Sequence, residues 1–167
     1  MTTRKHRPAG LSLIEAVQWH GYSVDSRGCH VWSGYLNDSG YGVFRHGGQR
    51  GKLYRAHRVV YEEHHGPIPE GMVIDHRCHN PACINLEHLN LVTYRQNGEN
   101  RAGPNKRSAI GIRGVSWHEG NQMWRARASS NGQEYVRYCH THEEAAAVVV
   151  ELRRQVFTNS DLEVGAQ

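Results

Sequence analysis

Residues 75–97 read DHRCHNPACINLEHLNLVTYRQN, and this short stretch decides how the whole chain is interpreted. Two cysteines, three histidines and four asparagines stand within it. Its reactive side chains follow the spacing H-x-C-x4-C-x4-H-x8-N, at His76, Cys78, Cys83, His88 and Asn97. Zinc in proteins takes about four ligands at tetrahedral corners, and thiolate and imidazole groups suit it. The stretch therefore predicts a zinc site.

Two sets of ligands compete for this ion. In one set, a single structural zinc is bound by His76, Cys78, Cys83 and His88. In the other, Cys29 supplies the fourth ligand and His76 stays outside the metal shell. A ligand from Cys29 closes a longer loop, which removes more entropy from the unfolded chain and slightly favours the second set.

A His76 outside the metal shell also explains Asp75 and Asn97. Their oxygen atoms are hard ligands, which suit Mg²⁺ or Mn²⁺ rather than zinc. A neutral imidazole beside such an ion can take a proton from water, while the ion stabilises charge on a phosphate oxygen. Together these groups have the chemistry of phosphodiester hydrolysis. The simpler interpretation is that Asp75 and Asn97 only cap turns.

Hydrophobic periodicity and turn residues predict the elements around this stretch. Helices are expected at residues 11–20 and 54–65, and strands at 29–34, 41–47, 72–75 and 89–92. The turn-rich residues 35–40 predict that the first two strands form a hairpin. Thr93 and Gln96 have capping-box spacing and predict a helix that carries Asn97 over residues 94–101. Beyond residue 110 three strands are expected, at 114–119, 123–129 and 134–139, and then a helix that begins after Thr141.

The predicted fold class is α+β, with small sheets and two domains. Residues 1–10 are expected to form a disordered basic arm, 11–101 a metal-stapled domain, 102–110 a basic linker, and 111–160 a three-stranded antiparallel sheet on one helix. The 167 residues carry a net charge of +4 and 13 histidines, which favours a polyanionic partner and proton or metal chemistry. No apolar run approaches the roughly 20 residues of a membrane span, so a cytoplasmic protein is expected. In that compartment the four cysteines are interpreted as ligands or free thiols.

The predicted C-terminal sheet alternates along WRARAS. One face carries Trp124, Ala126 and Ala128, and the helix is expected to cover it; the other carries Arg125, Arg127 and Ser129. Arg113 and Arg137, from the neighbouring strands, are expected to join the open face. Such a grid can enter the major groove of double-stranded DNA, although an ordinary solvated face is the simpler interpretation. Lys106 and Arg107 of the linker are expected to follow the phosphate backbone.

Residues 56–101 and 29–44 together resemble the HNH nucleases of the His-Me finger, or ββα-metal, superfamily, and especially the phage and intron homing endonucleases. The resemblance implies that His76 is the general base, that Asn97 binds a catalytic Mg²⁺ or Mn²⁺, and that Cys29, Cys78, Cys83 and His88 hold structural zinc. The Asp-His pair is similar to that of phage HNH nickases and implies that Asp75 is a second ligand of the catalytic ion. In the family an arginine contacts the scissile phosphate, a role for Arg58 or Arg55. His88 stands where typical members have asparagine.

Residues 113–157 resemble the DNA-binding domain of plant ethylene-response factors. The match lies in Gly114-Val115, Trp124, the alternation of Arg125 and Arg127, and the alanine-rich helix. Ser116 stands where the plant pattern has arginine, so plant base preferences do not transfer. Cys139 is interpreted as a packed or free thiol.

These patterns predict a two-part endonuclease of homing type that cuts duplex DNA with one catalytic ion. The alternative is a non-catalytic, zinc-containing DNA-binding protein, which makes no demand on Asp75 or Asn97. An RNA-directed nuclease is disfavoured because the predicted sheet face lacks stacked aromatic residues. The sequence specifies neither the target site nor the oligomeric state.

Overall fold

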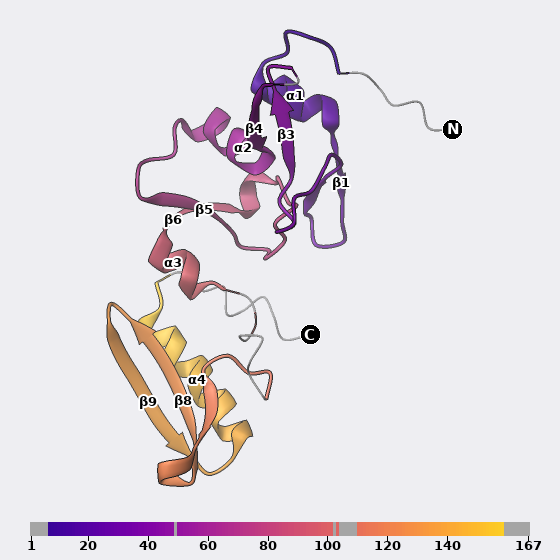
Figure 1. The fold of residues 1–167 in the computed structure, drawn as a ribbon. Coiled ribbons are helices and arrows are strands. Elements are labelled where there is room, and N and C mark those ends of the chain that lie inside the picture. Colours follow the sequence, from indigo (N-terminus) through magenta and orange to yellow (C-terminus); the bar gives the residue numbers. More distant parts are fainter. Residues whose placement is uncertain (1–6, 49, 102, 104–109, 159–167) are drawn as a thin grey trace. The chain divides into compact units, whose positions relative to one another are not determined.

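The computed structural model describes residues 7–48, 50–101, 103 and 110–158. It divides into two compact units, Met1–Tyr94 and Arg95–Gln167 (Figure 1). Within the described residues, every sheet is antiparallel and has two or three strands, which agrees with the predicted α+β class. The division comes earlier than the expected linker at 102–110, most of which lies outside the described residues, as do Lys106 and Arg107.

Two helices build the core of the first unit. Helix α1, Leu13–His20, begins at Ser12, whose hydroxyl accepts from the Glu15 amide while the Glu15 carboxylate accepts from the Ser12 amide. This capping box fixes the start of the helix. Helix α2, Ala56–His65, ends at Gly66. The two helices enclose a buried cluster that includes Ala16, Val17, Trp32, Phe44, Ala56, Val59, Val60 and Ile84.

The strand pairing of the first unit differs from the expected hairpin. Strand β2, His30–Trp32, pairs with β1, Tyr22–Val24, and strand β3, Val43–His46, pairs with β4, Lys52–Arg55. Neither β1 nor β4 was predicted. The expected hairpin of residues 29–47 forms only in part: β2 and β3 do not pair with each other, but the chain turns back between them through one antiparallel bridge, from Leu36 to Gly42.

The stretch around the histidines folds in the predicted order. Strand β5, Met72–His76, pairs with β6, Leu89–Thr93, and helix α3, Tyr94–Glu99, follows directly. Between the strands lie the loop of Cys78 and Cys83 and a short 3-10 helix, η1, Leu86–His88.

The second unit is a three-stranded sheet packed on one helix, as predicted. Its elements are β7, Val115–His118, the 3-10 helix η2, Glu119–Asn121, β8, Met123–Ser130, β9, Gln133–Cys139, and α4, His142–Val156. Positive φ angles of 53° and 75° at Asn131 and Gly132 form the tight turn from β8 to β9. Helix α4 lies along β8 in Figure 1, and its Ala145, Val149 and Leu152 pack on Ala126 and Ala128.

Helix α3 is held by contacts inside the second unit. Arg113 donates to the carbonyls of Gly98 (2.8 Å), Glu99 (3.1 Å) and Arg101 (2.7 Å). The buried Glu99 carboxylate accepts from Arg95, from the Ser130 hydroxyl and from the Thr158 amide (2.8 Å). Arg113 was expected in a strand on the open sheet face. Instead it precedes β7 and donates to carbonyls at the end of α3, where a helix leaves its last carbonyls without intrahelical donors.

Within the described residues, no helix has the length and apolar character that crossing a membrane demands.

Candidate metal centre and active site

Four predicted ligands converge in the first unit. The ligand atoms of Cys29, Cys78, Cys83 and His88 all lie within 4.8 Å of one another. Ligands of a tetrahedral zinc, at metal–sulfur distances of about 2.3 Å, stand roughly 3.8 Å apart, so this group needs little contraction to enclose an ion. His76 is not one of the four. The structure therefore brings together the set that includes Cys29, and the group can hold a metal ion.

Local hydrogen bonds position the distant ligand, Cys29. The Asp25 carboxylate accepts from the Cys29 amide at 2.9 Å, in the tight turn before β2. Asn85 then joins the two parts of the site, because its side chain donates to the Gly28 carbonyl (2.9 Å) and its amide donates to the Cys83 sulfur (3.4 Å). The Ile84 amide donates to the His30 carbonyl at 2.8 Å. These hydrogen bonds join the loop before β2 to the loop after β5.

The thiols interact strongly with one another. A hydrogen bond from Cys83 lowers the pKa of Cys78 to about 4, whereas the same contact raises the pKa of Cys83. Burial raises the pKa of Cys29. The Cys83 sulfur lies 3.6 Å from Nδ1 of His88. Three sulfur atoms and one imidazole form a soft donor set, which suits zinc better than magnesium or calcium.

His76 lies beside the Cys29, Cys78, Cys83 and His88 group, and the backbone of Cys83 orients its ring. Its Nε2 lies 3.0 Å from the carbonyl oxygen of Cys83. Because a carbonyl only accepts, Nε2 carries the hydrogen, and the lone pair of the neutral ring is on Nδ1. Burial lowers the pKa of His76, although the Cys83 carbonyl opposes the shift. Cys83 thus offers its sulfur to the metal site and its backbone to His76.

Two further rings pack around His76. The His57 ring stands nearly perpendicular to it, with centroids 4.8 Å apart, and the Tyr41 ring lies 5.3 Å from His57 and 6.0 Å from His76. His57 is 3% exposed, and its Nδ1 has no hydrogen-bond partner among the described residues. Burial lowers the pKa of His57 to about 2, and the nearby His76, Arg55 and Arg58 add to the shift. The guanidinium of Arg55 lies 5.0 Å from the Tyr41 ring centroid.

The remaining predicted catalytic residues are placed as follows. Asp75 precedes His76 in β5 and is 8% exposed, opposite Asn90 of β6. Asn97 lies in α3, in a segment that belongs to the second unit. Arg58 lies on α2, and its guanidinium is 4.0 Å from the Glu62 carboxylate. Arg55 is the last residue of β4.

The expected arginine grid on the second unit is smaller than predicted. Paired residues of an antiparallel sheet share a face, and Arg137 pairs with Ala126, on the side that α4 covers. Arg137 therefore does not join Arg125 and Arg127, so its expected placement was wrong. Arg127 forms an ion pair with Glu134 at 2.9 Å. The Nε atom of Arg125 is buried and has no partner in the part of the chain that the structure describes.

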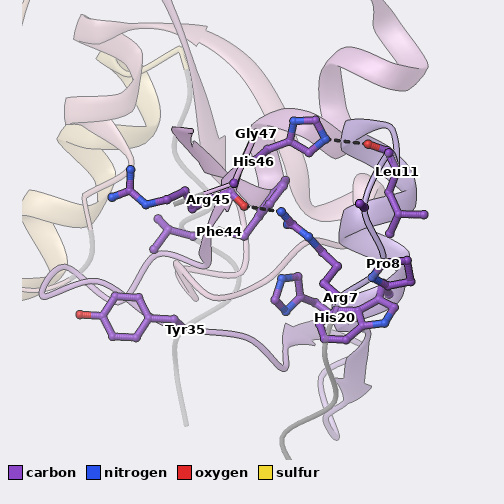
Figure 2. A pocket seen from close by; sticks show the side chains of 14 residues that line it. Arg7, Pro8, Leu11, His20, Tyr35, Phe44, Arg45, His46 and Gly47 are labelled. Carbon is purple, nitrogen blue, oxygen red and sulfur yellow. Dashed lines mark hydrogen bonds between the residues drawn. The ribbon is translucent and has the colours of Figure 1, made fainter. Parts of the chain in front are cut away.

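A separate pocket of about 960 Å³ lies between residues 7–11 and strand β3 (Figure 2). Arg7, expected in a disordered arm, donates to the Arg45 carbonyl at 2.7 Å, and its guanidinium lies 6.0 Å from the Phe44 ring centroid. The Nε2 atom of His46 is 2.7 Å from the Leu11 carbonyl. The residues that line this pocket include none of the predicted site residues, so it is distinct from the candidate active site.

Sequence reasoning overlooked Tyr41 and His57. A weak signal for His57 was available, because it shares the apolar face of α2 with Val60, three residues later. A histidine at a core position is an unusual choice, and that choice marks it for attention. Tyr41 had no signal, since it reaches His76 only through the path of the chain before β3.

Comparison with known proteins agrees with this site. A protein-family model described as HNH endonuclease matches residues 54–99. The chain is 45% identical over 71 residues to Protein 7.7 of Escherichia phage T7, covering 42% of this chain and 52% of that protein. It is 32% identical over 105 residues to Protein 3.8 of the same phage, covering 63% of this chain and 86% of that protein. The chain therefore contains an HNH endonuclease domain at residues 54–99.

The HNH match runs from strand β4 to helix α3 and contains Asp75, His76 and three of the four clustered ligands. Cys29 lies upstream of it. The chain is also 44% identical over 62 residues to an uncharacterized gene 5.3 protein of Enterobacteria phage T3, covering 35% of this chain and 61% of that protein. It spans about half the length of Protein 7.7, 52%. No solved structure matches the chain.

Proposed function

We propose that this HNH protein is an endonuclease that hydrolyses phosphodiester bonds in duplex DNA, with His76 as general base. The observation that carries the proposal is the orientation of His76. Its Nε2 donates to the Cys83 carbonyl, and its ring is not part of the four-ligand cluster. The unprotonated Nδ1 is then the atom that takes the proton from the attacking water. The phage relatives support a role in phage-infected bacteria. The homing type rests on the resemblance to homing endonucleases.

In this proposal zinc occupies the Cys29, Cys78, Cys83 and His88 group and has a structural role. A core of short strands and two helices buries few large side chains, so a metal staple supplies stability that packing does not. The staple also fixes the Cys83 carbonyl that orients His76. Loss of zinc therefore affects both stability and catalysis.

The assignment of Asp75 and Asn97 to a catalytic Mg²⁺ or Mn²⁺ rests on the resemblance to HNH nucleases and on their oxygen ligands. When bound, such an ion supplies positive charge for the phosphate and the leaving oxygen. Asp75 stands directly before His76 in β5, which supports a shared role. Arg58 or Arg55 is assigned to the scissile phosphate on the same resemblance.

The second unit is proposed to bind duplex DNA through Arg125 and Arg127. A three-stranded sheet packed on one helix supports the resemblance to ethylene-response-factor domains. The linker residues Lys106 and Arg107 are proposed to contact phosphates. Arg113 and Arg137 are left out of this surface, because Arg113 bonds to α3 carbonyls and Arg137 shares a face with Ala126.

Plasmid nicking tests the proposal. We expect the parent protein to nick supercoiled plasmid in Mg²⁺ or Mn²⁺, and His76→Ala to lose at least about 100-fold in rate, as expected when a general base is removed. His76→Ala should keep the parent's zinc content and its affinity for DNA. Loss of zinc in this variant would put His76 back among the metal ligands. If the parent binds DNA but does not cut it with any divalent ion, the result would instead support a non-catalytic, zinc-stapled DNA-binding protein.

A further inference from the structure

A second, cationic pocket lies where strand β4 runs into helix α2. It has a volume of about 350 Å³, and its charged lining consists of Lys52, Arg55, Arg58 and Glu62. We refer to it as the β4–α2 pocket. All of its residues belong to the first unit. None of them is a ligand of the Cys29, Cys78, Cys83 and His88 group.

The β4–α2 pocket carries an excess of positive charge. Among the described residues, no carboxylate lies within salt-bridge distance of Lys52 or Arg55. Arg58 has only Glu62, at 4.0 Å, and both side chains are about two-fifths exposed (42% and 41%). Such an exposed pair contributes little and is screened by salt. Three cations and one weakly engaged anion around a pocket of this size suit a phosphate group, which arginine grips with two donors.

The pocket also lies close to the proposed general base. Arg55 covers the Tyr41 ring, and that ring lies 6.0 Å from the ring of His76. Backbone contacts keep these parts together, since the Ala56 amide donates to the Gly42 carbonyl at 2.9 Å. A DNA strand that presents one phosphate to His76 therefore has its neighbouring backbone within reach of the pocket.

Arg58 points away from the base. His57 is buried against His76, and successive residues of a helix are turned by about 100°, which brings the side chain of Arg58 round to the exposed surface. Its guanidinium lies with Glu62, one turn further along α2. This placement fits a residue that holds the DNA better than one that touches the reacting phosphate.

We propose that the β4–α2 pocket binds a DNA backbone phosphate other than the one that is cut. Arg58 donates to its oxygens and Lys52 adds charge, which leaves Arg55, the other candidate, for the scissile phosphate. The proposal rests on the proposed function for its substrate, and it changes the role of Arg58 from the reaction to binding. It deepens that function by locating a second point where the DNA backbone is held.

Binding and cleavage measurements on Lys52→Ala and Arg58→Ala test this proposal. Affinity for a fluorescent duplex is measured over a series of salt concentrations, in a His76→Ala background that does not cut. Each variant should bind about 3- to 10-fold more weakly, and the slope of log K against log salt should fall by about 1, because one phosphate contact is lost. In the cutting background, KM should rise in both variants, and this rise should exceed any change in kcat at saturating DNA. Arg55 is left unchanged, because its guanidinium also packs on Tyr41.

Arg154→Ala is the matched control, because Arg154 also lies on a helix, is exposed and pairs with a glutamate at 4.0 Å. It should leave both affinity and slope unchanged. The proposal that this pocket binds a phosphate would be overturned if Lys52→Ala and Arg58→Ala keep the parent's affinity and salt slope while their zinc content and melting temperature are intact. A fall in kcat for Arg58→Ala at saturating DNA would return it to the reacting phosphate. If the parent does not cut but the slopes fall as expected, the nuclease proposal fails and the pocket stands.

Discussion

At the scale of single residues, Cys83 contributes to the candidate site through both its side chain and its backbone. Its sulfur belongs to the metal group, and its carbonyl accepts from His76. Cys83→Ser keeps the carbonyl but replaces a thiolate with a poor zinc ligand. We expect this variant to lose most of its zinc and its nicking activity together, whereas His88→Cys, which keeps four good ligands, should retain zinc. Native mass spectrometry measures the metal content.

The control for Cys83 is Cys139→Ser, since Cys139 is buried in the core of the second unit and is not one of the four clustered ligands. It should lower stability by about 1–3 kcal/mol through a buried hydroxyl and leave zinc unchanged. Full zinc occupancy in Cys83→Ser would show that the sulfur of Cys83 is not a ligand.

His57 should make stability depend on pH. Its pKa is about 2 in the folded protein and about 6.5 when unfolded, so below pH 6.5 the unfolded chain binds a proton that the folded protein does not. Stability therefore falls as the pH drops below 6.5, and this residue accounts for about 2 kcal/mol of loss at pH 5. The charged and titratable groups that act on the pKa of His57 are His76, Arg55 and Arg58.

His57→Phe removes this contribution and keeps a ring beside His76. Urea unfolding at several pH values gives the free energy of unfolding of the parent and of His57→Phe. From pH 6.5 to pH 5 the parent should lose more stability than the variant, so the difference between the two should grow. Protonation of the metal ligands affects both proteins equally and drops out of the difference. Parallel curves would mean that His57 takes up a proton inside the folded protein.

At the scale of elements, what could be predicted depended on whether the signal was local. The apolar spacing of α1, α2 and α4 and the Asn131-Gly132 turn are local, and the structure agrees with each. Strand pairing is not local. Strand β1 has three exposed residues and no alternation to reveal it, and β4 was interpreted partly as helix. Which face of the sheet Arg137 occupies depends on the register of β9 against β8. A shift of one residue would move its side chain to the other face, and the sequence pattern alone does not show which register forms.

For the candidate site, too, local spacing could be interpreted from the sequence and long-range contacts could not. The spacing of Cys78, Cys83 and His88 predicted three ligands, and it left the choice between Cys29 and His76 open. That choice depends on the bridge between Val31 and Cys83 and on the Asn85 bonds, which join distant segments. Tyr41 approaches His76 through the same kind of long-range contact.

The three bonds of Arg113 give a prediction for helix α3. Arg113→Ala leaves the carbonyls of Gly98, Glu99 and Arg101 without this donor, so we expect a loss of about 2–3 kcal/mol in the free energy of unfolding. Arg113→Lys should recover little, because an ammonium cannot reproduce the planar fork. Arg137→Ala, an exposed arginine of the same unit, is the control. If Arg113→Ala changes only DNA affinity and not stability, the arginine belongs to the DNA surface after all.

At the scale of the whole molecule, each unit has its own hydrophobic core, but only the first unit carries the candidate zinc ligands. All four clustered ligands lie in the first unit, whereas the second unit has its own core of Val115, Ala126, Val149, Leu152 and their neighbours. A zinc chelator should therefore lower the stability of the first unit and leave the second close to its original stability. Calorimetry of the full chain should show one transition that moves down by well over 10 °C on chelation and another that does not move, because structural zinc contributes directly to folding. Cys83→Ser without chelator should already show the lowered transition and should not respond to chelation further. A single transition that shifts as a whole would mean that the two cores unfold together, and that zinc stabilises the entire chain rather than the unit that carries its ligands.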